Sequence, residues 1–141
     1  MSTYPKSPTE MTDGMMYFPR MLDKIRLQAR GELPEDYHAN LGKPKTADGA
    51  CTNFLRTNYN VLCQRVAKGG TDEEILEWCY QNGRRLNAGD LTVWNSFISK
   101  LGWNDFATPR LEEDKEKYGI THRTDITTIP ELIDFDEKRR D

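Results

Sequence analysis

The sequence predicts an all-α fold, a single-domain irregular bundle of about six helices with one long loop. Apolar residues recur at the i, i+3, i+4, i+7 spacing of a buried helix face in most segments. No segment shows the alternation of apolar and polar residues that is typical of a strand bounded by turns. The 141 residues, 36% hydrophobic and 30% charged, fit one domain with its own core.

The first helix is expected over residues 19–30. Its apolar face carries Phe18, Met21, Leu22, Ile25 and Ala29. Pro19 suits the first helical turn, and Gly31 suits the left-handed position just past the end. Residues 1–13 lack an apolar pattern, so we expect a flexible arm there and one helical domain over residues 14–141.

A long loop is expected over residues 31–50, because the segment contains three Gly and two Pro with no sustained period. Connections in compact domains are usually about 4–6 residues long, and longer ones tend to be functional or disordered. A short helix is expected near residues 50–57.

Two further helices follow in the middle of the chain. The helical spacing recurs at Tyr59, Leu62, Cys63 and Val66. Gly69-Gly70 ends that helix. Thr71 and Glu74 form the capping-box pattern, which predicts a helix over residues 72–82.

Three helices are expected in the last third of the chain. The first covers residues 89–101 and carries Trp94 and Phe97 on its apolar face. The second is mostly charged and runs over residues 108–118, and the third is a short helix near residues 130–138.

The charge distribution limits the choice of partners. The net charge of -3 argues against a protein that binds nucleic acid mainly by neutralising phosphates. Residues 1–70 hold 10 basic and 7 acidic side chains, whereas residues 71–141 hold 10 basic and 16 acidic ones. An anionic ligand would therefore prefer the first half. No apolar run is long enough to span a bilayer, so we expect neither a nucleic-acid nor a membrane partner.

Cysteine usage and the start of the chain indicate a reducing compartment. Cys51, Cys63 and Cys79 form no metal-binding or redox spacing, so we expect free thiols, no metal and no cofactor. The segment from Met1 to Glu10 lacks the basic and apolar regions of an export signal, which favours a cytoplasmic protein.

A basic helix–loop surface is the first candidate site. At 100° per residue, Arg20 and Lys24 lie within about 40° of each other on the face turned away from Phe18, with Asp23 alongside. Further positive charge comes from Arg26, Arg30, Lys43 and Lys45. This surface predicts binding of a small anionic ligand or an acidic protein segment. The alternative is an ordinary solvated helix face with surface ion pairs.

The long loop adds Tyr37, His38 and Asn40 to the candidate site. An imidazole titrates near neutrality, so His38 is a candidate general acid or base, with Asp48 as a carboxylate partner. The alternative is a histidine that packs its ring or lies in solvent.

Three functions from different classes remain open at this point. The first is anion binding at Arg20, Asp23, Lys24, Tyr37 and Asn40. The second is an enzyme that uses His38. The third is an interaction module, in its simplest form a homodimer, that uses either apolar surface near Trp103 or the acidic second half of the chain.

A resemblance to a known family rests on five short motifs. They are YFPRMLDKIR (17–26), YH (37–38), FL (54–55), TDEEILEW (71–78) and VWN (93–95). Over residues 14–137 the chain resembles a small bacterial domain of unknown function. The resemblance implies a compact helical bacterial protein, and it transfers neither an activity nor a catalytic residue.

Overall fold

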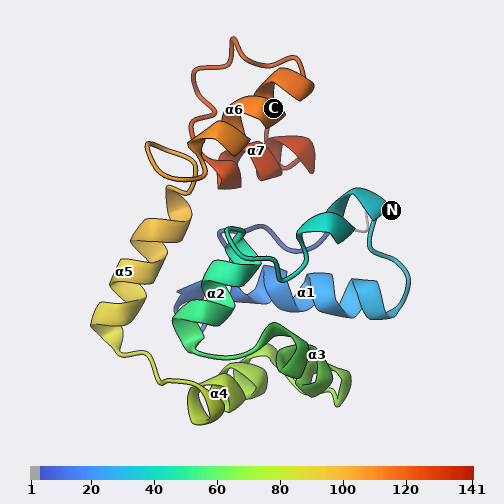
Figure 1. The fold of residues 1–141 in the computed structure, drawn as a ribbon, viewed down its shortest axis with the longest axis vertical. Coiled ribbons are helices and arrows are strands. Elements are labelled where there is room, and N and C mark those ends of the chain that lie inside the picture. Colours follow the sequence, from blue (N-terminus) through green and yellow to red (C-terminus); the bar gives the residue numbers. More distant parts are fainter. Residues whose placement is uncertain (1–3) are drawn as a thin grey trace.

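The computed structural model describes residues 4–141 and confirms the mostly helical class (Figure 1). In chain order its elements are β1 (Met11–Thr12), β2 (Met15–Met16), α1 (Phe18–Ala29), the 3-10 helix η1 (Glu35–Asn40), α2 (Ala47–Leu55), α3 (Tyr59–Ala67), α4 (Asp72–Asn82), α5 (Ala88–Ser99), α6 (Thr108–Lys117) and α7 (Ile129–Asp136). The structure has seven α-helices and a 3-10 helix among the described residues, more than the six or so helices expected. It also contains a two-stranded sheet, although no strand was expected. None of the described helices is both long and apolar enough to cross a membrane.

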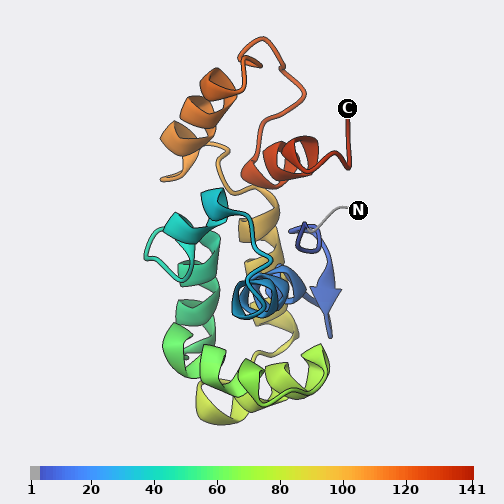
Figure 2. The same ribbon diagram turned by 90° about the vertical axis from the view of Figure 1, so that its right-hand side faces the viewer.

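Helix α1 lies at the centre of the molecule, between α2 and the β1–β2 hairpin, with α3 and α4 at one end and α6 and α7 at the other (Figure 2). It occupies this place because its apolar face is fully buried at Phe18, Met21 and Leu22. Trp94 of α5 is also buried and donates its indole N–H to the carbonyl of Met16 at 2.8 Å, which joins α5 to β2. The main core is therefore organised around α1.

Helices α6 and α7 enclose a second, smaller apolar cluster. Its buried members are Leu111, Ile120, Ile126 and Leu132. Ile129, at the start of α7, packs against both clusters, and its amide donates to the carbonyl of Leu101 at 2.6 Å. The α6–α7 pair thus covers one end of the main core, and the junction between the two clusters is where the candidate site lies.

Local sequence signals explain most of the helix starts. Thr71 and Glu74 form the predicted capping box, with side-chain to backbone bonds of 3.2 and 3.0 Å. Helix α2 begins earlier than expected because the Thr46 hydroxyl accepts from the amide of Gly49 at 3.2 Å and caps the helix at Ala47.

The segment 31–50, expected as one long loop, is interrupted by helices. Helix η1 fills its middle and α2 begins before its end. Gly31 and Pro34 precede η1, Gly42 and Pro44 lie between η1 and α2, and Gly49 lies within the first turn of α2. The prediction of a continuous loop is therefore wrong, and side chains from this segment have fixed positions.

Residues 4–13, expected as a flexible arm, pack against the domain. Ser7 is buried and its hydroxyl donates to the Asp134 carboxylate at 2.9 Å. Asp13 and Gly14 have φ angles of 46° and 81°, as the turn of a tight hairpin requires, and connect β1 to β2. Two-residue strands are too short to produce an alternating pattern. Residues 1–3 of the expected arm lie outside the described residues.

Candidate functional site

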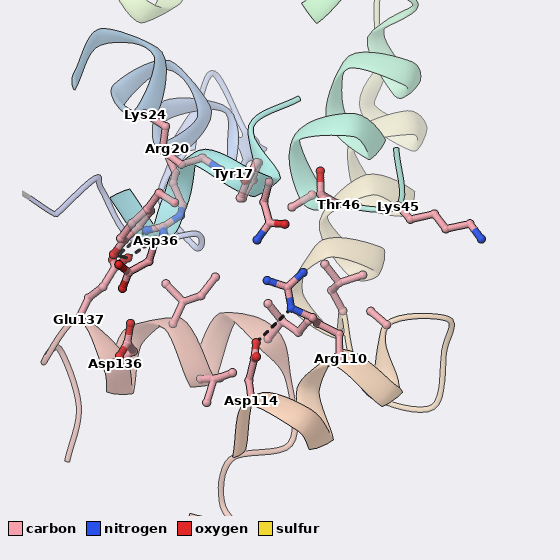
Figure 3. A pocket seen from close by; sticks show the side chains of 18 of the residues that line it. Tyr17, Arg20, Lys24, Asp36, Lys45, Thr46, Arg110, Asp114, Asp136 and Glu137 are labelled. Atoms are coloured by element: carbon pink, nitrogen blue, oxygen red, sulfur yellow. Dashed lines mark hydrogen bonds and ion pairs between the residues drawn. The ribbon is translucent and has the colours of Figure 1, made fainter. Parts of the chain in front are cut away.

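A cleft of about 270 Å³ lies at the junction of the two apolar clusters (Figure 3). Its polar wall comes from Tyr17, α1 and η1, and carries Arg20, Lys24, Tyr37 and Asn40. Its apolar wall comes from the end of α5 and from α7, with Leu101, Ile129, Leu132 and Ile133. Helix α6 adds Arg110 and Asp114. The cleft therefore combines an apolar side with a small number of polar groups, as ligand pockets typically do.

One end of the polar wall is a buried ion pair between α1 and the residue after α7. Arg20 donates to both carboxylate oxygens of Glu137, at 2.8 and 2.7 Å, and both side chains are almost fully buried. The same carboxylate accepts from the Tyr37 hydroxyl and from Arg139, each at 2.6 Å. Burial raises the pKa of Glu137, but these hydrogen bonds outweigh it and hold the pKa below its ordinary value. Glu137 is therefore ionised and neutralises Arg20.

The other end is a second buried group made by Tyr17, Lys24 and Asp48. Lys24 Nζ lies 2.8 Å from Asp48 Oδ1 and donates to the Tyr17 hydroxyl at 3.0 Å. That hydroxyl donates to Asp48 Oδ1 at 2.6 Å, and the amide of Gly42 donates to Oδ2 at 3.2 Å. Asp48 is wholly buried, and Tyr17 has a left-handed backbone with φ 76°.

Burial determines the protonation of this group. It raises the pKa of Tyr17, and the neighbouring Asp48 carboxylate raises it further, so the phenol stays a donor. Burial also lowers the pKa of Lys24, and the attraction of the Asp48 carboxylate only partly offsets that decrease.

Several polar groups around the cleft have hydrogen-bonding capacity that no group among residues 4–141 uses. The Arg110 guanidinium points from α6 into the cleft and binds Asp114 only through Nε, at 3.3 Å, which leaves its terminal amino groups unpaired (Figure 3). The Asn40 amide lines the cleft and makes no side-chain hydrogen bond. Asp36 and Asp136 lie at the opposite end from Lys45, which points away from the centre. The cleft thus offers donors that a ligand can use.

Across the part of the chain that the structure describes, no three His, Cys, Asp or Glu side chains gather in a way that could hold a metal ion. Cys51, Cys63 and Cys79 are free thiols.

With the cleft defined, comparison with known families identifies the chain. A family model described as Domain of unknown function (DUF5069) matches residues 2–139. The chain belongs to the DUF5069 family. The match confirms the resemblance to a domain of unknown function and assigns no activity to it. A search of curated proteins finds no match to this DUF5069 chain.

The DUF5069 structure brings four of the predicted site residues together. Arg20, Lys24, Tyr37 and Asn40 all line the cleft. However, Arg20 and Lys24 are 3% and 8% exposed, so the expectation of a basic solvent-facing surface is wrong. Elements distant in sequence cover this side of α1, and their carboxylates neutralise both cations.

Two predicted site residues lie elsewhere. Asp23 accepts from the amide of Lys6 at 3.1 Å and lies 3.7 Å from Arg26, and it does not line the cleft. His38 is exposed, lies outside the cleft lining, and places its Nε2 3.0 Å from the carbonyl of Leu33. Asp48, expected as a partner of His38, pairs with Lys24 instead.

Sequence reasoning missed Tyr17, Arg110 and Glu137 of the DUF5069 site. Tyr17 precedes the first helix, and Arg110 and Glu137 belong to segments that appear only charged and solvent-exposed. No local pattern distinguishes Glu137 from its charged neighbours, because its partner Arg20 is 117 residues away.

Proposed function

We propose that the cleft binds a small molecule that carries one carboxylate group and an apolar body. The observation that carries the proposal is Arg110, whose terminal amino groups face the cleft without a protein partner. A guanidinium with free terminal donors is suited to a bidentate contact with a carboxylate. The unpaired Asn40 amide is a second donor in the same lining.

Charge balance favours a ligand with a single negative charge. The basic members of the lining, Arg20, Lys24, Lys45 and Arg110, are matched in number by the acidic members, Asp36, Asp114, Asp136 and Glu137. Within this set Arg20 is paired with Glu137, and Lys24 is paired with Asp48, a buried carboxylate outside the lining. A ligand with several phosphate groups would therefore meet uncompensated repulsion from Asp36 and Asp136.

Volume and lining favour a small molecule over an acidic protein segment. A cavity of about 270 Å³ is slightly smaller than the range of about 300–1,000 Å³ that is typical of ligand pockets. The apolar side made by Leu101, Ile129 and Leu132 supports an aliphatic portion of a few carbon atoms. We place this activity in the reducing cytoplasm of a bacterial cell, a setting that the free cysteines and the resemblance favour.

The test is a calorimetric titration with butanoate, a carboxylate with a short apolar chain. Loss of a charge-assisted contact costs about 1.5–3 kcal/mol, so Arg110→Ala should weaken binding by about tenfold or more. Lys117→Ala is the matched control, because Lys117 is an exposed cation of the same helix outside the cleft lining. Equal affinities for wild type and Arg110→Ala would refute the placement of the carboxylate.

A second candidate function is an interaction module. It is favoured by Trp103, which is 58% exposed, and by Phe106, which is 52% exposed and stacks on Phe97 at 6.4 Å. An exposed tryptophan is a typical anchor of protein interfaces. Light scattering of wild type and Trp103→Ala would show a dimer that the variant loses, whereas a wild-type monomer at high concentration would exclude the homodimer.

A further inference from the structure

Lys24 is a buried amine at the wall of a cleft, with part of its hydrogen-bonding capacity unused. Its side chain is 10% exposed and lines the cleft beside Tyr17. An ammonium group has three N–H donors. Two of them face Asp48 and the Tyr17 hydroxyl, at 2.8 and 3.0 Å, and the third has no partner among residues 4–141.

The buried surroundings of Lys24 favour the neutral form of its amine. A lysine in a salt bridge on the protein surface stays in water and is not favoured in this way. Burial favours the uncharged form of the Lys24 amine, because a buried ammonium group loses its hydration. The Tyr17 hydroxyl and the Gly42 amide both donate to Asp48, so this carboxyl group stays fixed beside the amine. Burial lowers the pKa of Lys24 in the same direction. Buried lysines of this kind serve as nucleophiles in proteins.

We propose that Lys24 condenses with an aldehyde or ketone group of the bound ligand to form an imine. This inference rests on the proposed function and narrows its ligand class to oxo-carboxylates. Figure 3 places Lys24 and Arg110 on opposite sides of the cleft, so the carbonyl group and the carboxylate belong at opposite ends of the ligand. An aliphatic portion between them would lie along the apolar wall.

The condensation balances without an oxidant or a reductant. Lys24 first passes a proton to Asp48, and the amine lone pair then forms a C–N bond to the carbonyl carbon while the carbonyl π electrons move to oxygen. A proton moves from nitrogen to that oxygen and gives a carbinolamine. The hydroxyl group then takes the proton back from Asp48, the C–O bond breaks, and water leaves. The product is a protonated imine beside an ionised Asp48.

Tyr17 and Asp48 have different parts in this step. Asp48 holds the proton of Lys24 and returns it to the leaving hydroxyl group. Tyr17 is a positioning residue, because its hydroxyl bridges Lys24 and Asp48 and fixes both.

The test is reductive trapping on the full-length wild-type protein. The probe is succinic semialdehyde, which carries an aldehyde and a carboxylate at opposite ends, in the presence of cyanoborohydride near neutral pH. Peptide mass mapping then locates the reduced adducts. We expect Lys24 to be modified severalfold faster than the exposed Lys117, which lies outside the cleft lining, because burial lowers the pKa of Lys24 and so increases its neutral fraction. Adducts on exposed lysines with none at Lys24 would overturn the inference.

Variants and a second probe separate this inference from the proposed function. Lys24→Arg keeps the positive charge and should lose the adduct, whereas Lys117→Arg, a change at an exposed lysine outside the cleft lining, should retain it. Butanal, which has the same chain length but no carboxylate, should modify Lys24 more slowly than succinic semialdehyde, and Arg110→Ala should abolish that difference.

Calorimetric binding of succinic semialdehyde that depends on Arg110 but yields no Lys24 adduct would refute the imine alone. Equal trapping of both aldehydes, unchanged in Arg110→Ala, would support the reactive amine and refute the carboxylate contact.

Discussion

Replacement of Glu137 by glutamine should destabilise the protein by about 3 kcal/mol, the lower end of the range for breaking a buried ion pair. The substitution keeps the shape of the side chain but removes its charge. The Arg20 guanidinium, 3% exposed, would then remain buried with one of its two carboxylate contacts replaced by an amide N–H. Tyr37 and Arg139 would compete for the single remaining acceptor oxygen.

Urea unfolding followed by circular dichroism measures this effect. With a slope of about 1–3 kcal/mol per molar urea, the midpoint should fall by about 1–3 M. Glu77→Gln is the matched control, because Glu77 pairs with Arg85 on the surface and its replacement should leave the midpoint almost unchanged. A midpoint for Glu137→Gln equal to that of wild type would refute the view that this pair fixes α7 against α1.

The same pair predicts how stability depends on pH. The pKa of Glu137 in the folded state is lower than its ordinary value of about 4.3. Its contribution is therefore complete above about pH 4.3 and is lost as pH falls through the folded-state pKa. The stability difference between wild type and Glu137→Gln should shrink over this acid range. A difference that stays constant in acid would show that the carboxylate charge does not stabilise the fold.

Three further predictions concern other parts of the molecule. Asp48→Asn should cost about 3 kcal/mol in urea unfolding, because the buried Lys24 amine and Tyr17 hydroxyl would lose the carboxylate that both contact; unchanged stability would show that this buried group does not stabilise the fold. Gly83→Ala should lower the melting temperature, because the new Cβ would lie 2.0 Å from the carbonyl oxygen of Leu55 and force the backbone to move; a melting temperature equal to that of wild type would contradict this close approach. Trp103→Ala should leave the melting temperature nearly unchanged, because the side chain is 58% exposed; a large decrease would place Trp103 in the core.

Local signals account for the parts of the fold that the sequence predicts well. The capping box at Thr71 and Glu74 and the apolar face of α1 depend on residues within a few positions of one another, and both are present. The start of α2 was not predicted, because its first turn contains Gly49, and glycine usually indicates a loop. The hairpin before α1 was not predicted, because its strands have two residues each and are too short to show an alternating pattern.

The candidate site was predictable only in part, since Arg20, Lys24, Tyr37 and Asn40 line the cleft but Asp23 and His38 do not. The helical period places Arg20 and Lys24 close together, and the structure confirms that both line one cleft. The helical period also places Arg20 and Lys24 on the side opposite the apolar face. Such a position predicts exposure to solvent for both side chains. Glu137 and Asp48 cover that side from elements far along the chain, and no local pattern reports such long-range packing.

The most direct test of the proposed cleft is a nuclear magnetic resonance titration of the wild-type protein with butanoate. Saturable shifts should be concentrated at cleft residues, including the side-chain amide of Asn40 and the methyl groups of Leu132 and Ile133. Arg110→Ala should require about tenfold more butanoate to produce the same shifts. Shifts that are absent, or confined to surfaces such as that around Trp103, would contradict ligand binding in the cleft.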